Sequence, residues 1–305
     1  MRIFVLLLMV PSVVIHAFRP TALVTGSTDG IGVTTAKNLA AKGYNVLVHG
    51  RDEKRIESAC TVIRNYVKEW SNDPDILIES VQADLSTVHG CERLAQDVKK
   101  VCHEKDLHLT VIMNNAGVYA ENLIETADGT ELTFAVNVLA PFVVTSHLLP
   151  ELIRSKSRIV IASSISQCRS IRDWDDLNYH TRSYSAHGAY SESKLLDAML
   201  AKEFAERLQE AGHGPDQVTC NSLDPGTVNT KMLLAGWGPC GIAVESALDQ
   251  TYLCSSPEVE GVTGQYFRWR SQSRSDYPAS ERQKMWNVLS DLAPSAAQMW
   301  KFDWK

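Results

Sequence analysis

The sequence lacks several features that would define other classes of protein. Basic side chains are not in surplus: 30 lysines and arginines stand against 36 acidic residues, and the formal net charge is −6. That balance argues against nucleic-acid binding, which calls for a basic face. The seven cysteines are scattered and include no Cys-x-x-Cys pair, so neither a disulfide framework nor a metal site is expected. No internal repeat or low-complexity segment occurs, and the 44% apolar and 22% charged shares are ordinary for a globular protein.

The N-terminus carries an apolar run that is short for a membrane span. A basic residue precedes residues 3–15, which are mostly apolar, and Ala17 offers a small residue for cleavage. A spanning helix needs about 20 residues. The pattern predicts that residues 1–17 are a signal or targeting segment, with a short membrane anchor or an apolar arm packed on the domain as alternatives. We therefore expect entry into the secretory pathway or the ER membrane. If cleavage leaves Phe18 first, followed by Arg and Pro, the leader resembles those of proteins sent to plastids of secondary origin.

Apolar runs and amphipathic segments alternate along the rest of the chain. Short buried runs predict strands at 21–24, 45–48, 76–81, 107–113, 158–162, 217–223 and 264–267. Helical spacing predicts helices between them, of which 52–70 is the clearest, while 131–153 contains Pro141, which kinks or divides it. Strands that alternate with helices imply right-handed crossovers and a parallel sheet covered on both faces. We expect residues 18–305 to form one α/β domain, a doubly wound Rossmann fold with about seven strands.

A glycine-rich turn follows the first predicted strand. Residues 25–32 read Thr-Gly-Ser-Thr-Asp-Gly-Ile-Gly. Glycine lets the backbone turn tightly and approach a ligand, and the next helix offers its N-terminus to a phosphate. The spacing differs from the Gly-x-Gly-x-x-Gly fingerprint, but a place between a strand and a helix is that of a dinucleotide site. The predicted contacts are Gly26, Ser27, Thr28, Asp29, Gly30, Ile31 and Gly32.

The end of the second strand bears on the choice between the two nicotinamide cofactors. There the chain reads His49-Gly50-Arg51-Asp52. An acidic residue at this place would bind ribose hydroxyls, whereas an arginine suits the extra 2′-phosphate. Arg51 therefore favours NADP(H). NAD(H) is the alternative, because Asp52 is either a helix cap or a rival ribose acceptor. Arg55 is either a second phosphate contact or a surface charge.

A tyrosine and a lysine stand four residues apart in the second half of the chain. On a helix, Tyr190 and Lys194 would lie on one face, one above the other. A nearby ammonium favours the ionised phenol, so Tyr190 could act as a general acid or base near neutral pH. Taken alone, the pair also describes a helix with a half-buried tyrosine and a solvated lysine. Further motifs are needed to choose between these interpretations.

Several motifs, taken in order, resemble those of one enzyme family. Besides the glycine turn and the tyrosine–lysine pair they are Asp84-Leu85, residues 114–117, Asn137, Ser163-Ser164 and Asp224-Pro225-Gly226. From residue 21 to about 232 this order resembles the short-chain dehydrogenase/reductases, and most of all their retinol-dehydrogenase-like and WW-domain-oxidoreductase-like branch. The resemblance implies an oxidoreductase that interconverts an alcohol and a carbonyl with a nicotinamide cofactor.

The resemblance also assigns cofactor contacts beyond the glycine turn. It implies that Asp84 contacts the adenine, that Asn115 steadies the sheet beside the cofactor, and that Thr230 reaches the pyrophosphate. The further contacts that it implies are Leu85, Ala116, Gly117, Tyr190, Lys194, Pro225, Gly226 and Thr227.

Four residues carry the chemistry that the resemblance implies. Tyr190 would exchange a proton with the substrate oxygen, while Lys194 would lower the pKa of Tyr190 and bind the nicotinamide ribose. Ser164, rather than Ser163, would hold the substrate oxygen, and Asn137 would complete a proton relay through water. A carbonyl that receives hydride develops a negative oxygen, so donors aimed at that atom stabilise the transition state.

The segment 230–250 falls where this family places a mobile substrate lid. Its apolar residues are Met232, Leu233, Leu234, Trp237 and Ile242. An apolar lid indicates a small apolar substrate, such as a retinoid, a steroid or a lipid aldehyde or ketone; a core helix without substrate contact is the alternative. A nucleotide-binding scaffold or regulatory protein without turnover is the second functional hypothesis, against which the intact Ser164, Tyr190 and Lys194 argue. A homodimer and membrane association are further expectations.

Some residues depart from the family pattern or lie outside it. The gap between Ser164 and Tyr190 is long and holds Trp174 and Tyr184, which either line the substrate pocket or pack the loop. Asp224 stands where many relatives have another residue. Three tryptophans lie near the C-terminus, and they are expected to pack on the domain, to contact a partner subunit or to contact a membrane surface. They are Trp286, Trp300 and Trp304.

Overall fold

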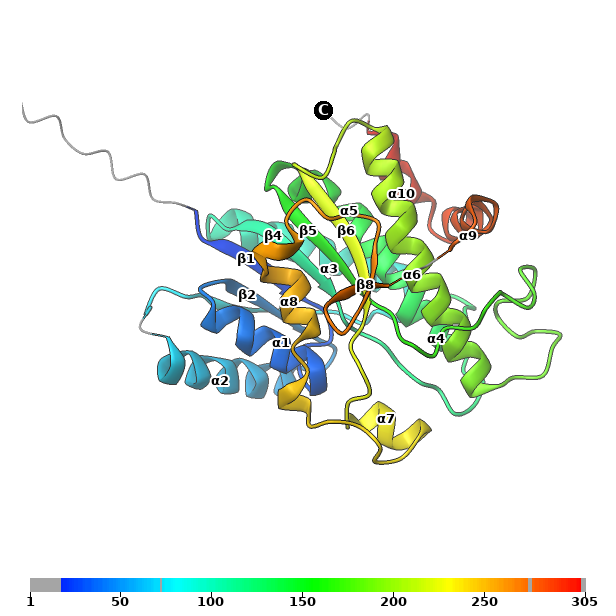
Figure 1. The fold of residues 1–305 in the computed structure, drawn as a ribbon, viewed down its shortest axis with the longest axis horizontal. Helices are drawn as coiled ribbons and strands as arrows, with labels where there is room; N and C mark the ends of the chain where they lie inside the picture. Colours follow the sequence, from blue (N-terminus) through cyan, green and yellow to red (C-terminus); the bar gives the residue numbers. More distant parts are fainter. Residues whose placement is uncertain (1–17, 72, 274–275, 303–305) are drawn as a thin grey trace, which may run out of the picture.

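One eight-stranded sheet runs through the molecule, in the order β3-β2-β1-β4-β5-β6-β7-β8 (Figure 1). The computed structural model describes residues 18–71, 73–273 and 276–302, so the predicted leader (1–17) and Trp304 lie outside the described residues. Neighbouring strands are parallel except for the last pair. The strands are β1 (Pro20–Val24), β2 (Asn45–Gly50), β3 (Ile78–Gln82), β4 (His108–Asn114), β5 (Ser157–Ala162), β6 (Val218–Asp224), β7 (Tyr266–Arg268) and β8 (Ser271–Ser273).

The predicted doubly wound fold is confirmed, with one strand more than expected. The additional strand, β8, has three polar residues and pairs antiparallel with β7. Trp269 and Arg270 form the tight turn between them, with φ of 51° and 59°. Two-residue hairpin turns of this kind usually have the sequence Asn-Gly or Asp-Gly. Here neither the turn nor the strand carries its usual pattern, so the sequence did not indicate the hairpin.

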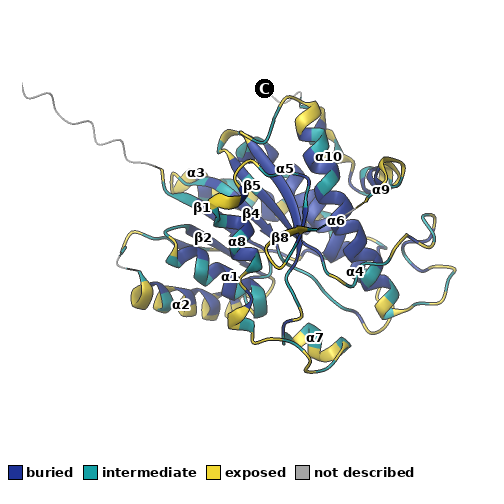
Figure 2. Ribbon diagram, in the orientation of Figure 1, coloured by how far each residue is buried: buried dark blue, intermediate teal, exposed yellow. Residues whose placement is uncertain are grey.

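Helices cover both faces of the sheet. One face packs against α1 (Gly30–Ala41), α2 (Glu53–Trp70) and α8 (Asp249–Ser255), and the other against α3 (Val88–Glu104), α5 (Ala140–Arg154) and α6 (Ala186–Glu210). Outside α5 and α6 lie α9 (Ala279–Leu292) and α10 (Pro294–Gln298). Figure 2 shows the central strands of the sheet as buried, while the short helix α7 (Lys231–Gly236) stands apart with no buried residue.

The helix predicted over 131–153 is divided. After α4 (Leu132–Phe134) the chain makes a π-helical turn, Ala135–Leu139, and α5 begins at Ala140. Because Pro141 has no N–H, it cannot donate to the carbonyl of Asn137, four residues earlier. The stretch Leu132–Arg154 has the length and composition of a membrane span, with a hydropathy of 1.7, but 89% of the window is buried inside the domain. Its apolar side chains therefore fill the core.

Aromatic residues of the C-terminal segment and of the long loop between Ser164 and Tyr190 pack against the domain. Trp286 and Trp300 are buried; the Trp300 ring stacks on Phe204 at 4.5 Å between centroids. Trp174 donates from Nε1 to Glu281 of α9 at 2.8 Å, and the Tyr184 hydroxyl donates to the Ala120 carbonyl at 2.8 Å. Trp174 and Tyr184 of the long gap thus pack the loop.

Candidate active site

The candidate site lies at the carboxyl ends of the strands, where the strand order reverses between β1 and β4. Doubly wound sheets bind their ligands at this switch point. A cavity of about 810 Å³ opens there. Every site residue predicted from the sequence lines it, except Ser27 and Asn137. The fold therefore brings residues separated by up to two hundred positions to one place.

The glycine turn is close-packed against its neighbours. Gly26 and Gly30 have φ of 63° and 54°, which favour glycine. A Cβ on Gly32 would lie 2.4 Å from the Gly26 carbonyl oxygen and 2.5 Å from Asn115 Nδ2. A Cβ on Gly30 would lie 3.3 Å from Thr230 Cγ2, so the segment that leads into α7 begins against this turn. The bare backbone at the N-terminus of α1 is a cradle of the kind that holds a pyrophosphate.

A buried histidine supports the glycine turn from behind. The Gly26 amide donates to His49 Nδ1 at 3.0 Å, and His49 Nε2 lies 3.3 Å from the Ala83 carbonyl, which fits the tautomer protonated at Nε2. Ser27 also points inward, where its Oγ accepts from the His49 amide at 2.9 Å. Sequence reasoning assigned His49 no role, and its only signal was a polar residue at the end of a buried strand.

We expect His49 to make folding stability fall as the pH drops below neutrality. Burial lowers its pKa to about 4, against a smaller opposing effect of the Ala83 hydrogen bond. The unfolded chain has an ordinary histidine pKa of about 6.5. Stability is therefore complete above about pH 6.5 and is lost as the pH falls towards 4, by up to about 3 kcal/mol.

The measurement is urea unfolding of the wild type and of His49→Gln at pH 7 and pH 4.5. Glutamine can accept from Gly26 and donate to Ala83 but does not titrate. All other titrating groups are common to both proteins, so the difference isolates His49. The wild type should lose more stability than the variant on acidification; equal losses would contradict the assignment.

An amide network joins the end of β4 to the glycine turn. Asn115 Nδ2 donates to the Thr25 carbonyl at 2.9 Å, and its Oδ1 accepts from Gln250 of α8 at 3.0 Å. Thr25 Oγ1 accepts from the amides of Asn115 and Ala116, each at 3.0 Å. This geometry suits the steadying role expected of Asn115. Gln250, which is distant in sequence, carried no pattern that pointed to it.

Cations border the end of the cavity that lies beside β2. Arg51 is exposed and lines the cavity, as does Arg55. Asp52 is the N-cap of α2, and its Oδ1 accepts from the Arg55 amide at 2.9 Å. The Asp29 carboxylate binds both Arg55 at 3.0 Å and Lys231 at 2.6 Å. Of the two roles open to Asp52, the structure shows the helix cap.

Tyr190 and Lys194 are buried on one face of α6. Burial raises the pKa of Tyr190, while Lys194 and a hydrogen bond with Ser164 act in the opposite direction. Burial disfavours the Lys194 ammonium, but the charges of Asp197 and Tyr190 more than offset this and raise its pKa. Ser163 Oγ donates to the Lys194 carbonyl at 2.6 Å, so Ser164 is the serine that faces the phenol.

Asn137 lies just behind the cavity, in the π-helical turn. Its Oδ1 accepts from the Val118 amide at 2.8 Å, and its Nδ2 donates to the Val118 carbonyl at 3.1 Å and to Ser193 Oγ at 2.9 Å. A Cβ on Gly117 would lie 3.3 Å from Asn137 Oδ1 and 3.7 Å from Lys194 Nζ. Asn137 therefore holds the chain segment that passes beside the lysine.

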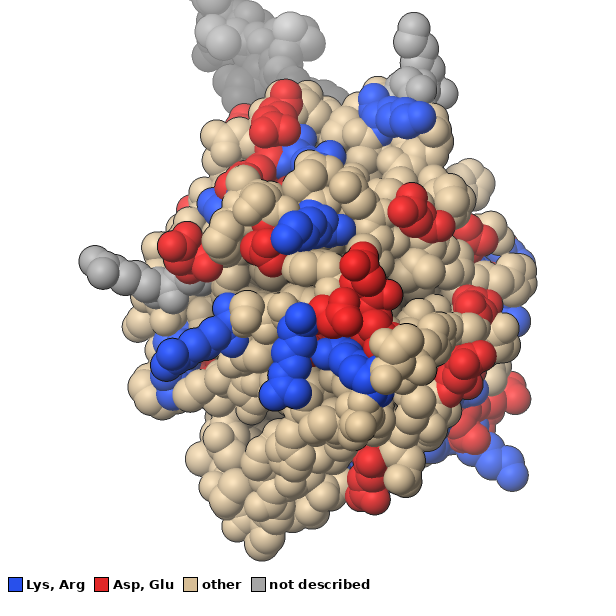
Figure 3. Space-filling model, turned by 90° about the vertical axis from the view of Figure 1, so that its right-hand side faces the viewer, with Lys and Arg blue, Asp and Glu red and all other residues tan. Residues whose placement is uncertain are grey.

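An aromatic cluster packs against Tyr190 beside the cavity. Trp237, at the end of α7, lies with its ring centroid 5.4 Å from that of Tyr190 and 5.0 Å from that of Tyr119. The Tyr119 hydroxyl is 2.7 Å from His187 Nδ1. Met232, Leu233 and Leu234 also line the cavity, so the apolar segment after Thr230 faces the site. Figure 3 shows mostly uncharged side chains at the lower end of the molecule, the end at which α7 lies in Figure 1.

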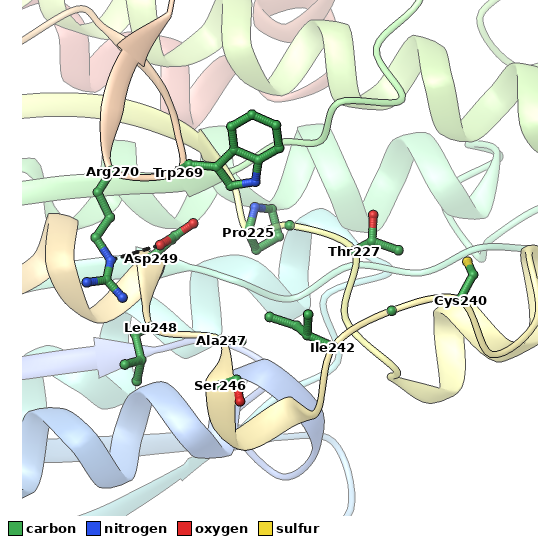
Figure 4. Close-up of a pocket in the computed structure, with 12 residues that line it drawn as sticks. Pro225, Thr227, Cys240, Ile242, Ser246, Ala247, Leu248, Asp249, Trp269 and Arg270 are labelled. Atoms are coloured by element: carbon green, nitrogen blue, oxygen red, sulfur yellow. Dashed lines mark hydrogen bonds and ion pairs between the residues drawn. The ribbon is translucent and has the colours of Figure 1, made fainter.

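A second hollow, of about 640 Å³, adjoins the first (Figure 4). Both hollows are lined by Pro225, Gly226, Thr227 and Cys240, so the loop that follows β6 lies between them. Trp269 and Ile242 border the second hollow, and the Arg270 guanidinium pairs there with Asp249 at 3.1 Å. The loop expected at the nicotinamide therefore has open space on both sides.

The fold and this site define a nucleotide-binding oxidoreductase of the Rossmann type. The family model described as "short chain dehydrogenase" matches residues 20–235. Human retinol dehydrogenase 14 is 33% identical over 269 residues, which are 81% of this chain and 77% of that protein. Human polyprenol dehydrogenase is 32% identical over 291 residues, 89% and 84% of the two chains. The chain belongs to the short-chain dehydrogenase/reductase family, in its retinol-dehydrogenase-like branch, and is an oxidoreductase that acts on CH–OH groups with a nicotinamide cofactor.

Solved structures agree on the fold. The 3-oxoacyl (acyl-carrier-protein) reductase of Agrobacterium tumefaciens C58, with NADP bound, superposes with a TM-score of 0.62 at 22% identity, covering 82% of this chain and 92% of that one. The residues of the present site fit a dinucleotide cofactor, because the glycine turn, with Gly26 and Gly30 at positive φ, lines the cavity and presents bare backbone at the N-terminus of α1.

Proposed function

We propose that this protein is an NADP-dependent oxidoreductase that interconverts an apolar alcohol and its aldehyde or ketone, with Tyr190 as the acid–base group. One observation carries the proposal: a single cavity is lined by Arg51, by Ser164, Tyr190 and Lys194, and by apolar side chains of the segment after Thr230. These are the three parts that such a reaction needs, namely cofactor selection, proton transfer and a substrate pocket.

The cofactor would lie along the carboxyl ends of the strands. The glycine turn and Thr230 would hold its pyrophosphate, Asp84 and Leu85 its adenine, and Arg51 its 2′-phosphate. The nicotinamide end would lie among Ala116, Gly117, Pro225, Gly226 and Thr227, close to Lys194. When bound, the nicotinamide supplies hydride exchange with the substrate carbon.

The side chains of this chain handle the substrate oxygen and its proton. In reduction, Tyr190 gives its phenolic proton to the oxygen as it becomes negative, and Ser164 donates a hydrogen bond to the same atom. Lys194 stabilises the tyrosinate that remains. Asn137, beside Gly117, would complete a proton relay in which water carries the proton towards the lysine. In oxidation each step runs in reverse.

The substrate class follows from the lid and from the names of relatives. Met232, Leu233, Leu234 and Trp237 place apolar surface at the cavity mouth. Relatives named for retinol and polyprenol dehydrogenation share about a third of their residues with this chain. We propose a retinoid, an isoprenoid or a similar lipid as substrate, and the segment 230–250 as the substrate lid.

We expect Arg51→Ala to weaken NADPH binding about 10- to 100-fold, because charge-assisted hydrogen bonds to a phosphate contribute about 1.5–3 kcal/mol. NADH binding should stay within about twofold, because NADH lacks the 2′-phosphate. The measurement is titration of each cofactor into the wild type and the variant, followed by turnover with a panel of retinoid and isoprenoid aldehydes.

Arg154→Ala is the matched control, because Arg154 is exposed at the end of α5 and pairs only locally with Glu151. It changes the net charge equally and should leave both affinities unchanged. An equal loss of NADPH and NADH affinity in Arg51→Ala would contradict the assignment of Arg51 to the 2′-phosphate. NADPH binding without turnover of any carbonyl would favour the nucleotide-binding scaffold instead.

A further inference from the structure

A buried carboxylate adjoins the proposed acid–base pair. Asp197 follows Lys194 by three residues on α6, and its exposed fraction is 0%. Its Oδ2 accepts a hydrogen bond from Lys194 Nζ at 2.8 Å. Tyr190, Lys194 and Asp197 follow the i, i+4, i+7 spacing, so they lie along one face of the helix. The proton transfer proposed above makes no use of this carboxylate.

Stability gives no reason for a carboxylate at this position. The second oxygen, Oδ1, is buried and has no hydrogen-bond partner among the residues that the structure describes. Burying an ion pair costs free energy that is recovered only when every polar atom is satisfied, and apolar replacements are often equally stable. A half-satisfied charge beside a reacting group therefore indicates a role in the chemistry.

Other elements bring few charged groups to the inner side of this pair. From β5, the Ala162 carbonyl accepts a second hydrogen bond from Lys194 Nζ, at 2.9 Å. At the end of β6, Asp224 disfavours the ionised Tyr190, as Asp197 does. Lys194 is therefore held between two acceptors, and its positive charge faces a negative charge at short range.

Besides Lys194, Tyr190 contacts two aromatic rings and a serine hydroxyl. The Tyr119 and Trp237 rings lie 5.8 Å and 5.4 Å from its ring centroid, and Tyr119 is hydrogen-bonded to His187 of the same helix. Ser164 hydrogen-bonds to the phenol from the end of β5. Lys194 is thus the cation whose charge acts on Tyr190, and Asp197 is the group paired with that cation.

We propose that Asp197 is a positioning residue: its carboxylate orients the Lys194 ammonium and offsets its charge, so that Tyr190 stays protonated to higher pH than the lysine alone would allow. The protonated phenol is the form that donates to a carbonyl oxygen, so Asp197 extends the pH range of carbonyl reduction on its alkaline side. Burial raises the pKa of Asp197 to about 6, against the opposing effect of Lys194, so above that pH the carboxylate is charged. This inference rests on the proposed function only in taking Tyr190 as the acid–base group.

The test is the titration of Tyr190 in the full chain without cofactor. Tyrosinate absorption is followed against pH in the wild type and in Asp197→Asn, and the same curves with Tyr190→Phe added are subtracted to isolate the one phenol. Removing the negative charge should lower the Tyr190 midpoint by about one pH unit. The alkaline limb of the pH profile for carbonyl reduction should move the same way.

Glu203→Gln is the matched control, because Glu203 is buried on the same helix and paired with Arg207 and Arg282, farther along α6. It should lower stability without moving the Tyr190 midpoint. Should Asp197→Asn not fold, Asp197→Ala provides the same comparison. An unchanged or raised midpoint in a folded Asp197 variant would overturn the proposal. A lowered midpoint in a protein that turns over no substrate would support it while contradicting the proposed function.

Discussion

Replacing Tyr190 with phenylalanine should lower kcat/KM for carbonyl reduction by about 10³-fold, roughly 4 kcal/mol of transition-state stabilisation. In the proposed mechanism the phenol is the donor that protonates the substrate oxygen. Ser164 and Lys194 cannot replace it: Ser164 is not acidic enough, and Lys194 Nζ is bound to Ala162 and Asp197. The ring remains, so α6 and the lid packing should persist. NADPH affinity should change by no more than about threefold. The measurement is steady-state kinetics together with cofactor titration.

Tyr119→Phe is the matched control. Its ring lies 5.8 Å from that of Tyr190, and its hydroxyl is bound to His187 rather than directed to the serine–lysine group. This change should cost less than about tenfold in kcat/KM, since no proton transfer passes through Tyr119. If both variants lost activity equally, the acid–base role would have to be shared between the two phenols. Full activity in Tyr190→Phe would contradict the proposed mechanism.

The second large effect is expected from Gly32→Ala, which should destabilise the fold by about 4 kcal/mol and abolish measurable cofactor binding. The new methyl would lie 2.4 Å from the Gly26 carbonyl oxygen and 2.5 Å from Asn115 Nδ2, and neither atom can retreat easily. Gly26 is held by His49, and Asn115 is held by Thr25 and Gln250. The glycine turn would have to open, and the backbone that faces the pyrophosphate would move. Urea unfolding and NADPH titration measure the two losses.

Gly212→Ala separates this collision from the general cost of adding a side chain. Gly212 follows α6, has a φ of 85° and would have no atom within 4 Å of a new Cβ. Only backbone strain of about 1–2 kcal/mol is expected there, with cofactor affinity unchanged. Equal destabilisation by the two substitutions would show that the close packing of Gly32 contributes little. Wild-type cofactor affinity in Gly32→Ala would contradict the placement of the pyrophosphate at this turn.

Much of the candidate site was predictable because its residues follow strands. The glycine turn follows β1, Arg51 follows β2, Asp84 follows β3, and Pro225 follows β6. Parallel strands all end at the same edge of a sheet, so residues that follow them collect there. The residues that hold the site in place were not predictable in this way. His49 reaches it from the next-to-last position of β2 and Gln250 from a distant helix, and no fixed spacing in the sequence indicates their contacts.

The sequence by itself determined the class of fold, the succession of seven strands along the chain and many of the groups that line the cavity, because apolar periodicity and strand-end motifs are local patterns. Only the tertiary structure decided that Asp52 caps α2, that Trp174 and Tyr184 pack the loop, and that β8 extends the sheet. It alone placed the Asp197 carboxylate against Lys194 in the core. In each case the outcome depends on which partner a side chain or a strand edge meets in space, and residues far apart in the chain supply that partner.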